Sequence, residues 1–215
     1  MLFAKALGAQ FRRFENREHE GKPARVMVAV RSYDTDREDL WDALTSRERI
    51  PRWFLPIEGD LKPGGRYQLK GNAGGTITRC EPPQALDVTW EFGGGMSWVT
   101  VRLSPEGKGT LLTLEHIVHA SDVDQHWAQF GPGAVGVGWD LAFLGLGRHL
   151  ESGGAAVDRD AAQAWMGSEA GKAYMRTSAT AWAEAHIAAG ENPETARAMA
   201  QRTIAAYTGA APTES

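Results

Sequence analysis

The sequence predicts an α+β fold in which a curved antiparallel β-sheet wraps around a long C-terminal helix, with extra helices at both ends of the chain. Three observations lead to this prediction. Residues 57–119 form short runs of alternating apolar and polar residues, separated by glycine and proline turns. No helical pattern intervenes between these runs to make parallel crossovers. An apolar stripe at helical spacing follows them and consists of Trp139, Phe143, Leu146 and Leu150.

The composition is that of a globular protein able to build its own core, with 42% hydrophobic and 23% charged residues among 215. The formal net charge of −4 gives no support for a nucleic-acid binder or a membrane binder, which usually carry a basic face. The single cysteine, Cys80, excludes a disulfide within the chain and is typical of a reducing compartment. Because no apolar run reaches about 20 residues, we expect a cytoplasmic protein.

Residues 1–22 are predicted to form an N-terminal amphipathic helix, because four apolar residues fall at helical spacing. These residues are Phe3, Leu7, Phe11 and Phe14. We expect the stripe to pack on the body of the protein. A homodimer contact and a weak contact with a membrane surface are the alternatives, in that order. Residues 24–34 then alternate in the pattern of a strand.

The elements of the centre and the tail follow from periodicity and capping. A helix over residues 36–46 is expected to be capped by Asp34 or Thr35, and a short helical turn follows over residues 47–54. The strands of the meander are expected at residues 57–61, 65–70, 75–80, 86–92, 96–103 and 110–119. Two tail helices are predicted over residues 168–189 and 192–209.

The glycine pairs of the meander are predicted to be turns rather than a phosphate-binding loop. A phosphate loop needs glycines directly between a strand and a helix, where backbone amides meet the anion. Gly64-Gly65 and Gly74-Gly75 are followed instead by the strand patterns RYQLKG and TITRC. A nucleotide site is therefore not expected here.

Four segments, in this order, resemble one known family: DREDLWDALTSRERIPRWFLPIEGDLKPGGRYQL, CEPPQALDVTWEF, GTLLTLEH and GWDLAFLGLGRHL. They are similar to the SRPBCC, or START-like helix-grip, superfamily, and within it to the activator of heat-shock protein 90 ATPase homologue family. The resemblance spans about residues 26–150 and implies a helix-grip domain over residues 23–152. The N-terminal helix over 1–22, a C-terminal helical extension over 153–209 and a frayed tail over 210–215 lie outside the shared core, which suggests a bacterial subgroup with helical additions.

The resemblance implies a ligand cavity between the sheet and the long helix. The superfamily includes lipid carriers, polyketide cyclases and aromatases, self-resistance proteins and co-chaperone domains. We therefore expect binding of a hydrophobic or aromatic small molecule, with no assigned catalysis. Two alternatives stay open. One is a cyclase or hydrolase that uses His116 as acid or base, with Tyr67 or Glu115. The other is a stress-response module that contacts the heat-shock ATPase and activates it.

Strand alternation predicts which side chains face inward. In residues 86–92 the apolar set is Leu86, Val88, Trp90 and Phe92. In residues 110–119 the inward set is Leu112, Leu114, His116 and Val118, so His116 is its polar member. The predicted cavity residues are Trp53, Tyr67, Trp90, Trp98, Leu114, His116, Trp139 and Phe143. Ordinary core packing is the alternative for the aromatic members of this set.

The segment HIVHASDVDQHW invites a metal assignment, which strand geometry argues against. Its candidate ligands are His116, His119, Asp122, Asp124 and His126. Residues three apart in a strand point to opposite faces, so His116 and His119 cannot share an ion while the strand stays regular. We expect no metal and no cofactor. Cys80 has no neighbouring histidine motif to activate it, so we expect a small buried apolar residue.

Overall fold

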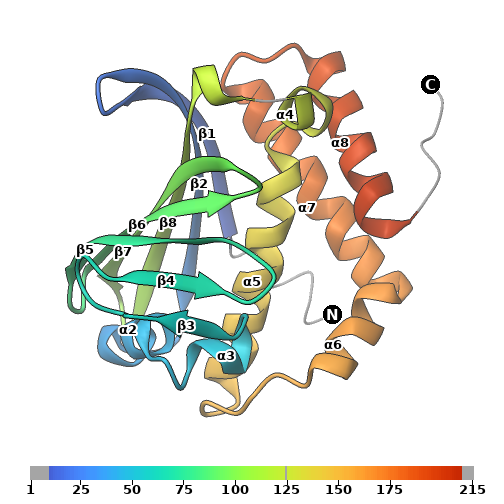
Figure 1. The fold of residues 1–215 in the computed structure, drawn as a ribbon. Coiled ribbons are helices and arrows are strands. Elements are labelled where there is room, and N and C mark those ends of the chain that lie inside the picture. Colours follow the sequence, from blue (N-terminus) through green and yellow to red (C-terminus); the bar gives the residue numbers. More distant parts are fainter. Residues whose placement is uncertain (1–9, 124, 210–215) are drawn as a thin grey trace.

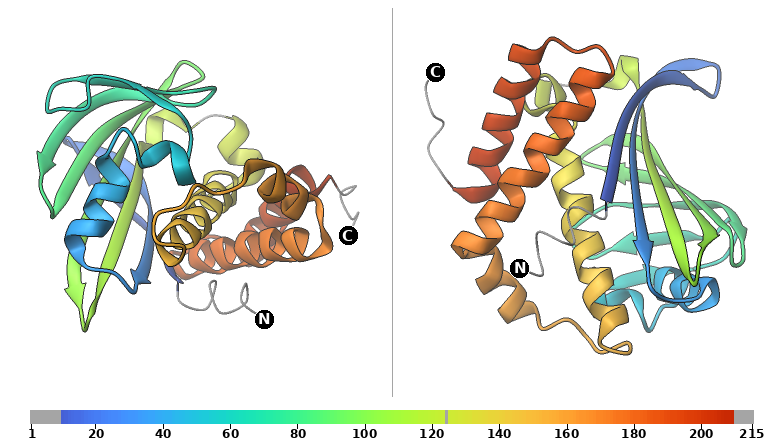
Figure 2. Two further views of the ribbon diagram at one scale, coloured as in Figure 1. Left: turned by 90° about the horizontal axis from the view of Figure 1, so that it is seen from below. Right: turned by 180° about the vertical axis from the view of Figure 1, so that it is seen from behind.

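The computed structural model describes residues 10–123 and 125–209 and has the predicted α+β architecture (Figure 1). A curved sheet lies on one side, and the helix α5 (Gly133–Glu151) runs across its concave face. The helices α6 (Arg159–Gly167), α7 (Glu169–Ala188) and α8 (Pro193–Thr208) form a layer on the other side of α5 (Figure 2). The structure is thus a helix-grip fold with an additional helical layer.

All neighbouring strands of the sheet pair antiparallel, in the order β1-β2-β8-β7-β6-β5-β4-β3. The strands are β1 (Gln10–His19), β2 (Lys22–Tyr33), β3 (Ile57–Gly59), β4 (Arg66–Leu69), β5 (Gly74–Glu81), β6 (Ala85–Phe92), β7 (Gly95–Glu106) and β8 (Gly109–His119). The shorter helices are α2 (Arg37–Thr45), α3 (Ile50–Trp53), the 3-10 turn η1 (Ala120–Asp122) and α4 (Gln125–Phe130). The strands predicted between residues 57 and 119 are confirmed, with small shifts at their ends.

The register of the sheet places apolar side chains in rows across its concave face. Leu86 of β6 lies opposite Val101 of β7, which lies opposite Leu114 of β8, which in turn lies opposite Ala29 of β2. Such cross-strand neighbours share one face of the sheet. The alternation read from the sequence therefore gives one continuous apolar surface toward α5.

The N-cap of α2 lies one residue after Thr35, the later of its two predicted caps. Asp36, rather than Asp34 or Thr35, is the N-cap, and its carboxylate accepts a hydrogen bond from the backbone N–H of Asp39 at 2.8 Å. Thr35 donates its hydroxyl to the carboxylate of Asp39 at 2.7 Å. Both acids thus stabilise the first turn, where the helix dipole favours negative charge.

The prediction of an N-terminal helix over residues 1–22 is wrong for its described part. Residues 10–19 form β1, which pairs with β2 through a tight turn, and residues 1–9 lie outside the described residues. Phe11 and Phe14 are three positions apart and therefore point to opposite faces of the strand. Phe14 packs against Trp127 and His186, whereas Phe11 is 59% exposed. The boundary expected at residue 23 falls inside this hairpin.

A buried carboxylate on α5 joins the sheet to the added helices. Arg12 of β1 donates to Asp140 Oδ2 through Nη2 at 2.7 Å and Nε at 2.8 Å. Gln10 donates to Asp140 Oδ1, and the hydroxyl of Ser178 on α7 donates to Oδ2. Because burying a charge is costly unless it is paired and hydrogen-bonded, these donors fix β1, α5 and α7 relative to one another.

The helices α6, α7 and α8 form the C-terminal extension predicted over residues 153–209. Both predicted tail helices are confirmed as α7 and α8, while α4 and α6 were not predicted. Val137 of α5 packs with Met175 and Ala179 of α7, so the extension shares a core with the long helix. The tail over 210–215 lies outside the described residues. Within residues 10–123 and 125–209, no helix has the length and hydropathy needed to cross a bilayer.

Close approach between α5 and its neighbours explains the glycines of this helix. A Cβ at Gly136 would lie 2.4 Å from the indole of Trp182, which is fully buried on α7. A Cβ at Gly145 would lie 2.8 Å from the backbone oxygen of Trp53. Each glycine costs helix stability relative to alanine, roughly 1 kcal/mol. Packing on both sides of α5 is what offsets this cost.

We expect Gly136→Ala to lower the free energy of unfolding by about 1 to 3 kcal/mol, because the new methyl group overpacks the core against Trp182. Gly138→Ala is the matched control on the same helix, since its nearest neighbour would be the Tyr207 hydroxyl at an ordinary 3.5 Å. The control should be neutral or stabilising by up to about 1 kcal/mol. Chemical denaturation measures both, and equal effects would contradict this account of the glycines.

Candidate functional site

A cavity of about 140 Å³ lies between the concave face of the sheet, α3 and α5, and we call it the sheet cavity. Strands β3 to β8 supply one wall, and the helices supply the other. It is lined by Leu44, Thr45, Ile50, Trp53, Phe54, Ile57, Leu61, Tyr67, Leu69, Ile77, Cys80, Leu86, Val88, Trp90, Val99, Val101, Leu112, Leu114, Trp139, Ala142 and Phe143. None of these residues is an acid, a base or a histidine.

Four polar groups of this lining make hydrogen bonds within the protein. Tyr67 Oη donates to the Thr89 carbonyl at 2.8 Å, and Trp53 Nε1 donates to the Ala43 carbonyl at 2.9 Å. Thr45 Oγ1 donates to the Trp41 carbonyl at 2.8 Å, and Trp139 Nε1 donates to His116 Nδ1 at 3.1 Å. Burial raises the pKa of the Tyr67 hydroxyl and of the Cys80 thiol, so both are neutral near pH 7. The cavity is therefore uncharged and offers a guest mainly apolar contact.

Six of the eight predicted cavity residues line the sheet cavity, namely Trp53, Tyr67, Trp90, Leu114, Trp139 and Phe143. Trp98 does not. It pairs with Ile117 and packs with Val26 and Val28 on the opposite face of the sheet, between the rings of His19 and His119. The prediction that Trp98 lines the cavity is therefore wrong. Successive side chains of a strand point to opposite faces, and Val99 and Val101 of the same strand face the cavity.

His116 lies beside the sheet cavity rather than in its lining. Trp139 Nε1 donates to its Nδ1, so Nε2 carries the proton and donates to Ser97 Oγ at 2.9 Å. The hydroxyl of Ser97 then donates to the Trp90 carbonyl at 3.1 Å. Burial lowers the pKa of His116 to about 4. The ring is thus neutral at pH 7, and both of its nitrogens already have partners, which does not suit a general acid or base.

This hydrogen-bonded chain separates the sheet cavity from a second hollow of about 240 Å³, which we call the hairpin pocket. Its lining includes the tip of the β6–β7 hairpin and α4, with the exposed side chains of Phe92 and Met96. His116 and Val118 line this pocket, while Leu112 and Leu114 line the sheet cavity. The inward set predicted for β8 therefore divides between two hollows.

A third hollow of about 290 Å³ lies between α5 and the added helix α6, and we call it the extension groove. Its lining consists of Trp53, Phe54, Leu55, Gly138, Leu141, Ala142, Leu144, Gly145, Arg148, Val157, Ala162, Trp165 and Met166. Arg148 is the charged member of this set, and its guanidinium lies over the ring of Trp165 at 5.3 Å. Trp53 and Phe54 of the α3 region line both this groove and the sheet cavity.

The histidines and acids after β8 do not converge on a metal site. His116 faces α5, whereas His119 lies on the other face of the sheet with Nδ1 3.8 Å from Asp122 Oδ2. Asp124 lies outside the described residues. Among residues 10–123 and 125–209, no group of three or more histidine, cysteine or acidic side chains is arranged to hold an ion.

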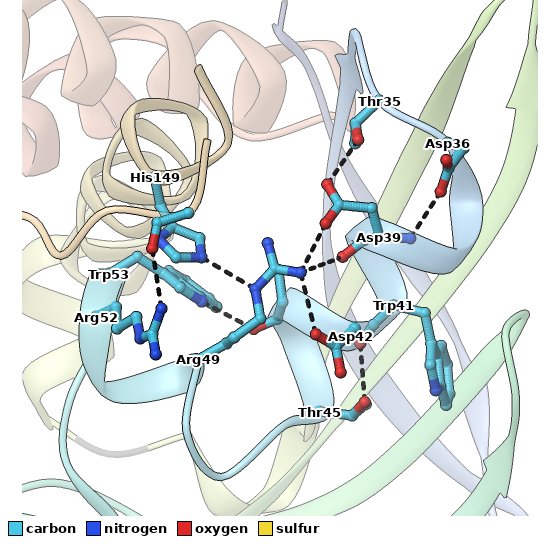
Figure 3. Close-up of polar contacts among 12 residues, drawn as sticks. Thr35, Asp36, Asp39, Trp41, Asp42, Thr45, Arg49, Arg52, Trp53 and His149 are labelled. Carbon is cyan, nitrogen blue, oxygen red and sulfur yellow. Dashed lines mark hydrogen bonds and ion pairs between the residues drawn. The ribbon is translucent and has the colours of Figure 1, made fainter. Parts of the chain in front are cut away.

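A polar cluster holds α3 against α2 and α5 (Figure 3). Arg49 Nη1 contacts the carboxylates of Asp39 at 2.7 Å and Asp42 at 3.0 Å, and Arg49 Nε donates to His149 Nε2 at 3.2 Å. His149 is fully buried and donates from Nδ1 to the Ala155 carbonyl at 2.8 Å. Although burial acts to raise it, hydrogen bonds from Thr35 and Arg49 hold the pKa of Asp39 below its ordinary value. The cluster therefore positions α3, whose Trp53 and the adjacent Phe54 form part of the wall of the sheet cavity.

Sequence reasoning missed this cluster. Asp39 and Asp42 are three apart on a helix and share a face, which signals a basic partner but does not name it. Arg49 and His149 are a hundred positions apart, so no spacing rule connects them. Only the packing of α5 against α3 brings them together.

The family model described as Activator of Hsp90 ATPase homolog 1-like protein matches residues 34–151, more than half of the chain. The chain belongs to this family. The match begins after β2 and ends with the last residue of α5. The match thus covers the elements that line the sheet cavity, while β1, β2 and the helices α6 to α8 lie outside the matched range.

CalU16 from Micromonospora echinospora is a similar solved structure. Its crystal structure has 34% sequence identity to the chain and a TM-score of 0.64, and the match covers 82% of this chain and 98% of CalU16. Its solution structure, also at 34% identity, gives a TM-score of 0.69 with 85% and 97% covered. These matches extend beyond residues 34–151, so CalU16 shares part of the additions.

A more distant match supports the fold alone. The protein MLL2253 from Mesorhizobium loti has 23% identity and a TM-score of 0.51, and the match covers 59% of this chain and 97% of that one. Among curated proteins, no significant match to the chain is found. The comparisons therefore establish family and fold, and the residues of the site must carry the argument about function.

The buried state of His116 predicts a pH dependence of stability. Its pKa of about 4 in the folded protein lies below the ordinary 6.5, so between these values the unfolded chain binds a proton that the folded chain does not. This contribution to stability is complete above about pH 6.5 and is lost as the pH falls toward 4, with a total of about 3 kcal/mol.

We therefore expect the advantage of the wild type over His116→Gln, measured by urea denaturation, to shrink by about that amount between pH 7 and pH 4. His126→Gln changes an exposed histidine and is the matched control. It should leave the pH profile unchanged. A His116→Gln profile parallel to that of the wild type would show that the ring is not held neutral.

Proposed function

We propose that this protein binds a neutral hydrophobic or aromatic small molecule in the sheet cavity. The observation that carries the proposal is a lining of 21 residues without a charged side chain, in which four of the polar groups donate to acceptors of the protein itself. Ligand sites are usually apolar hollows with few polar groups. A carboxylate or phosphate group would find no cationic partner there and would lose its hydration.

The volume of the cavity indicates the size of the guest. An engineered apolar cavity of about 150 Å³ stays dry and binds benzene. At about 140 Å³, the sheet cavity has room for a group the size of one aromatic ring. The rings of Trp90 and Trp139, with centroids 5.1 Å apart, lie in its wall and offer aromatic faces to such a group.

Two alternatives have weaker support. Cyclase or hydrolase chemistry by His116 would require Trp139 or Ser97 to release a ring nitrogen, and Glu115 is on the other face of the sheet, paired with Arg17. A contact with the heat-shock ATPase is supported by the description of the family alone. Homodimer formation and a cytoplasmic location stay predictions.

A cavity-filling variant tests the proposal. Fluorobenzene observed by ¹⁹F NMR should bind the wild-type protein, and at a concentration of 100 times its Kd it should stabilise the fold by about 2.7 kcal/mol. For a chain of this length the melting temperature then rises by roughly 5 to 10 °C. Val101→Phe fills the cavity and should abolish both effects.

Val30→Phe is the matched control, because Val30 packs on the opposite face of the sheet. It should bind fluorobenzene like the wild type. No binding to the wild type, or equal binding to Val101→Phe, would refute the cavity as the ligand site.

A further inference from the structure

The sheet cavity and the extension groove are separated by a thin wall. Trp53, Phe54 and Ala142 line both hollows. The rings of Trp53 and Phe54 stack on each other with centroids 5.3 Å apart, and the ring of Phe54 stacks in turn on Trp139 at 6.4 Å. The groove has about 290 Å³, roughly twice the volume of the cavity. A molecule longer than one ring would find room if this wall shifted.

The wall belongs to α3, a helix of one turn that stands outside the sheet. The segment between α5 and α6 and the start of α6 also contact it. Val157 N donates to the Arg52 carbonyl at 2.7 Å, and Arg52 Nη1 donates to the Gly154 carbonyl at 3.2 Å. Arg159 Nη2 donates to the Pro51 carbonyl at 3.2 Å. The side chains of Arg52 and Arg159 are exposed. Figure 3 shows Arg49, Arg52 and Trp53 on this turn, directed toward α2 and α5. Because α3 is not part of the sheet, Trp53 and Phe54 can move without breaking a strand pairing while the Arg49 cluster anchors the start of the turn.

The opposite wall of the cavity is built differently. Between the sheet cavity and the hairpin pocket, Trp90 is the residue that lines both hollows. The hydrogen-bonded chain from Trp139 through His116 and Ser97 to the Trp90 carbonyl ties α5, β8, β7 and β6 together. Opening this side would leave buried polar groups without partners, which is costly. Displacement of Trp53 would break one hydrogen bond, from its Nε1 to the Ala43 carbonyl, against three in the chain through His116, so the α3 wall yields more readily.

We propose that the extension groove is a second subsite for the ligand of the sheet cavity, joined to it by displacement of Trp53 and Phe54. The ligand class is then an elongated apolar molecule with two linked rings, one in each hollow. Leu141, Val157 and Met166 supply the apolar surface for the second ring. This inference rests on the proposed function and gives the added helix α6 a part in binding.

The test compares fluorobenzene, which fits the sheet cavity, with 4-fluorobiphenyl, which needs both hollows, by ¹⁹F NMR titration. Ala162→Phe fills the groove from α6 and should weaken 4-fluorobiphenyl binding by roughly tenfold or more while leaving fluorobenzene binding unchanged. Ala134→Phe fills the hairpin pocket instead and is the matched control, with no effect on either ligand.

A second pair of variants tests the mobile wall without touching either lining. Arg52→Ala combined with Arg159→Ala removes two of the hydrogen bonds that hold α3 and should strengthen 4-fluorobiphenyl binding a few-fold, by about 3 to 10 times. Arg66→Ala combined with Arg79→Ala removes two exposed arginines of the sheet and should change nothing.

Each other outcome has a definite meaning. If 4-fluorobiphenyl binds and Ala162→Phe leaves its affinity unchanged, or if Ala134→Phe weakens it, the groove is not the second subsite, while the proposed function stands. If 4-fluorobiphenyl fails to bind and fluorobenzene binds, the subsite proposal is overturned alone. If neither ligand binds the wild type, the proposed function fails first and the subsite with it.

Discussion

The structure depends on one helix that must pack closely on two sides at once. The sheet and α3 approach α5 from one side, and α7 and α8 approach it from the other. Gly145 admits the backbone of Trp53, and Gly136 admits the indole of Trp182, so the small residues of α5 set the spacing of both layers. Dense packing of this kind fixes the positions of side chains around the helix. The sheet cavity, the extension groove and the hairpin pocket are all lined in part by α5, so their shapes follow from where this helix lies.

Charge is arranged around this helix so that the sheet cavity stays apolar. Asp140 is turned away from the cavity toward Arg12 and Ser178, and the fully buried His149 is turned toward Arg49 and the loop after α5. Each of these buried polar groups has its partners elsewhere, as the cost of an unpaired buried group demands. The cavity is thereby left to aromatic and aliphatic side chains, and His116 supports one wall rather than acting on a guest.

The sequence predicts the centre of the fold well because local alternation decides it. Leu86, Val88 and Trp90 line the cavity as predicted, since a strand with one buried face shows its register in its pattern. The prediction for Trp98 is wrong because its large aromatic side chain suggests a cavity wall, whereas its position in the strand alternation places it on the opposite face. The pattern of residues 10–19 misleads because Phe11 and Phe14 fit helical spacing, whereas the bond that this strand makes from Arg12 to Asp140 is long-range. The contact of Arg49 with His149 is not predictable for the same reason, because local patterns carry no information about partners a hundred residues away.

The ion pair between Arg12 and Asp140 also bears on which fragment of this protein can fold by itself. The range shared with the family, 34–151, includes the carboxylate but omits its three side-chain donors, Gln10, Arg12 and Ser178. A fragment limited to residues 34–151 would leave the Asp140 carboxylate without these donors and would also expose the glycine surface of α5. The range matched by the family model and the unit that satisfies its buried charge therefore differ in this chain: the match ends at Glu151, whereas the side-chain donors to Asp140 lie in the flanks.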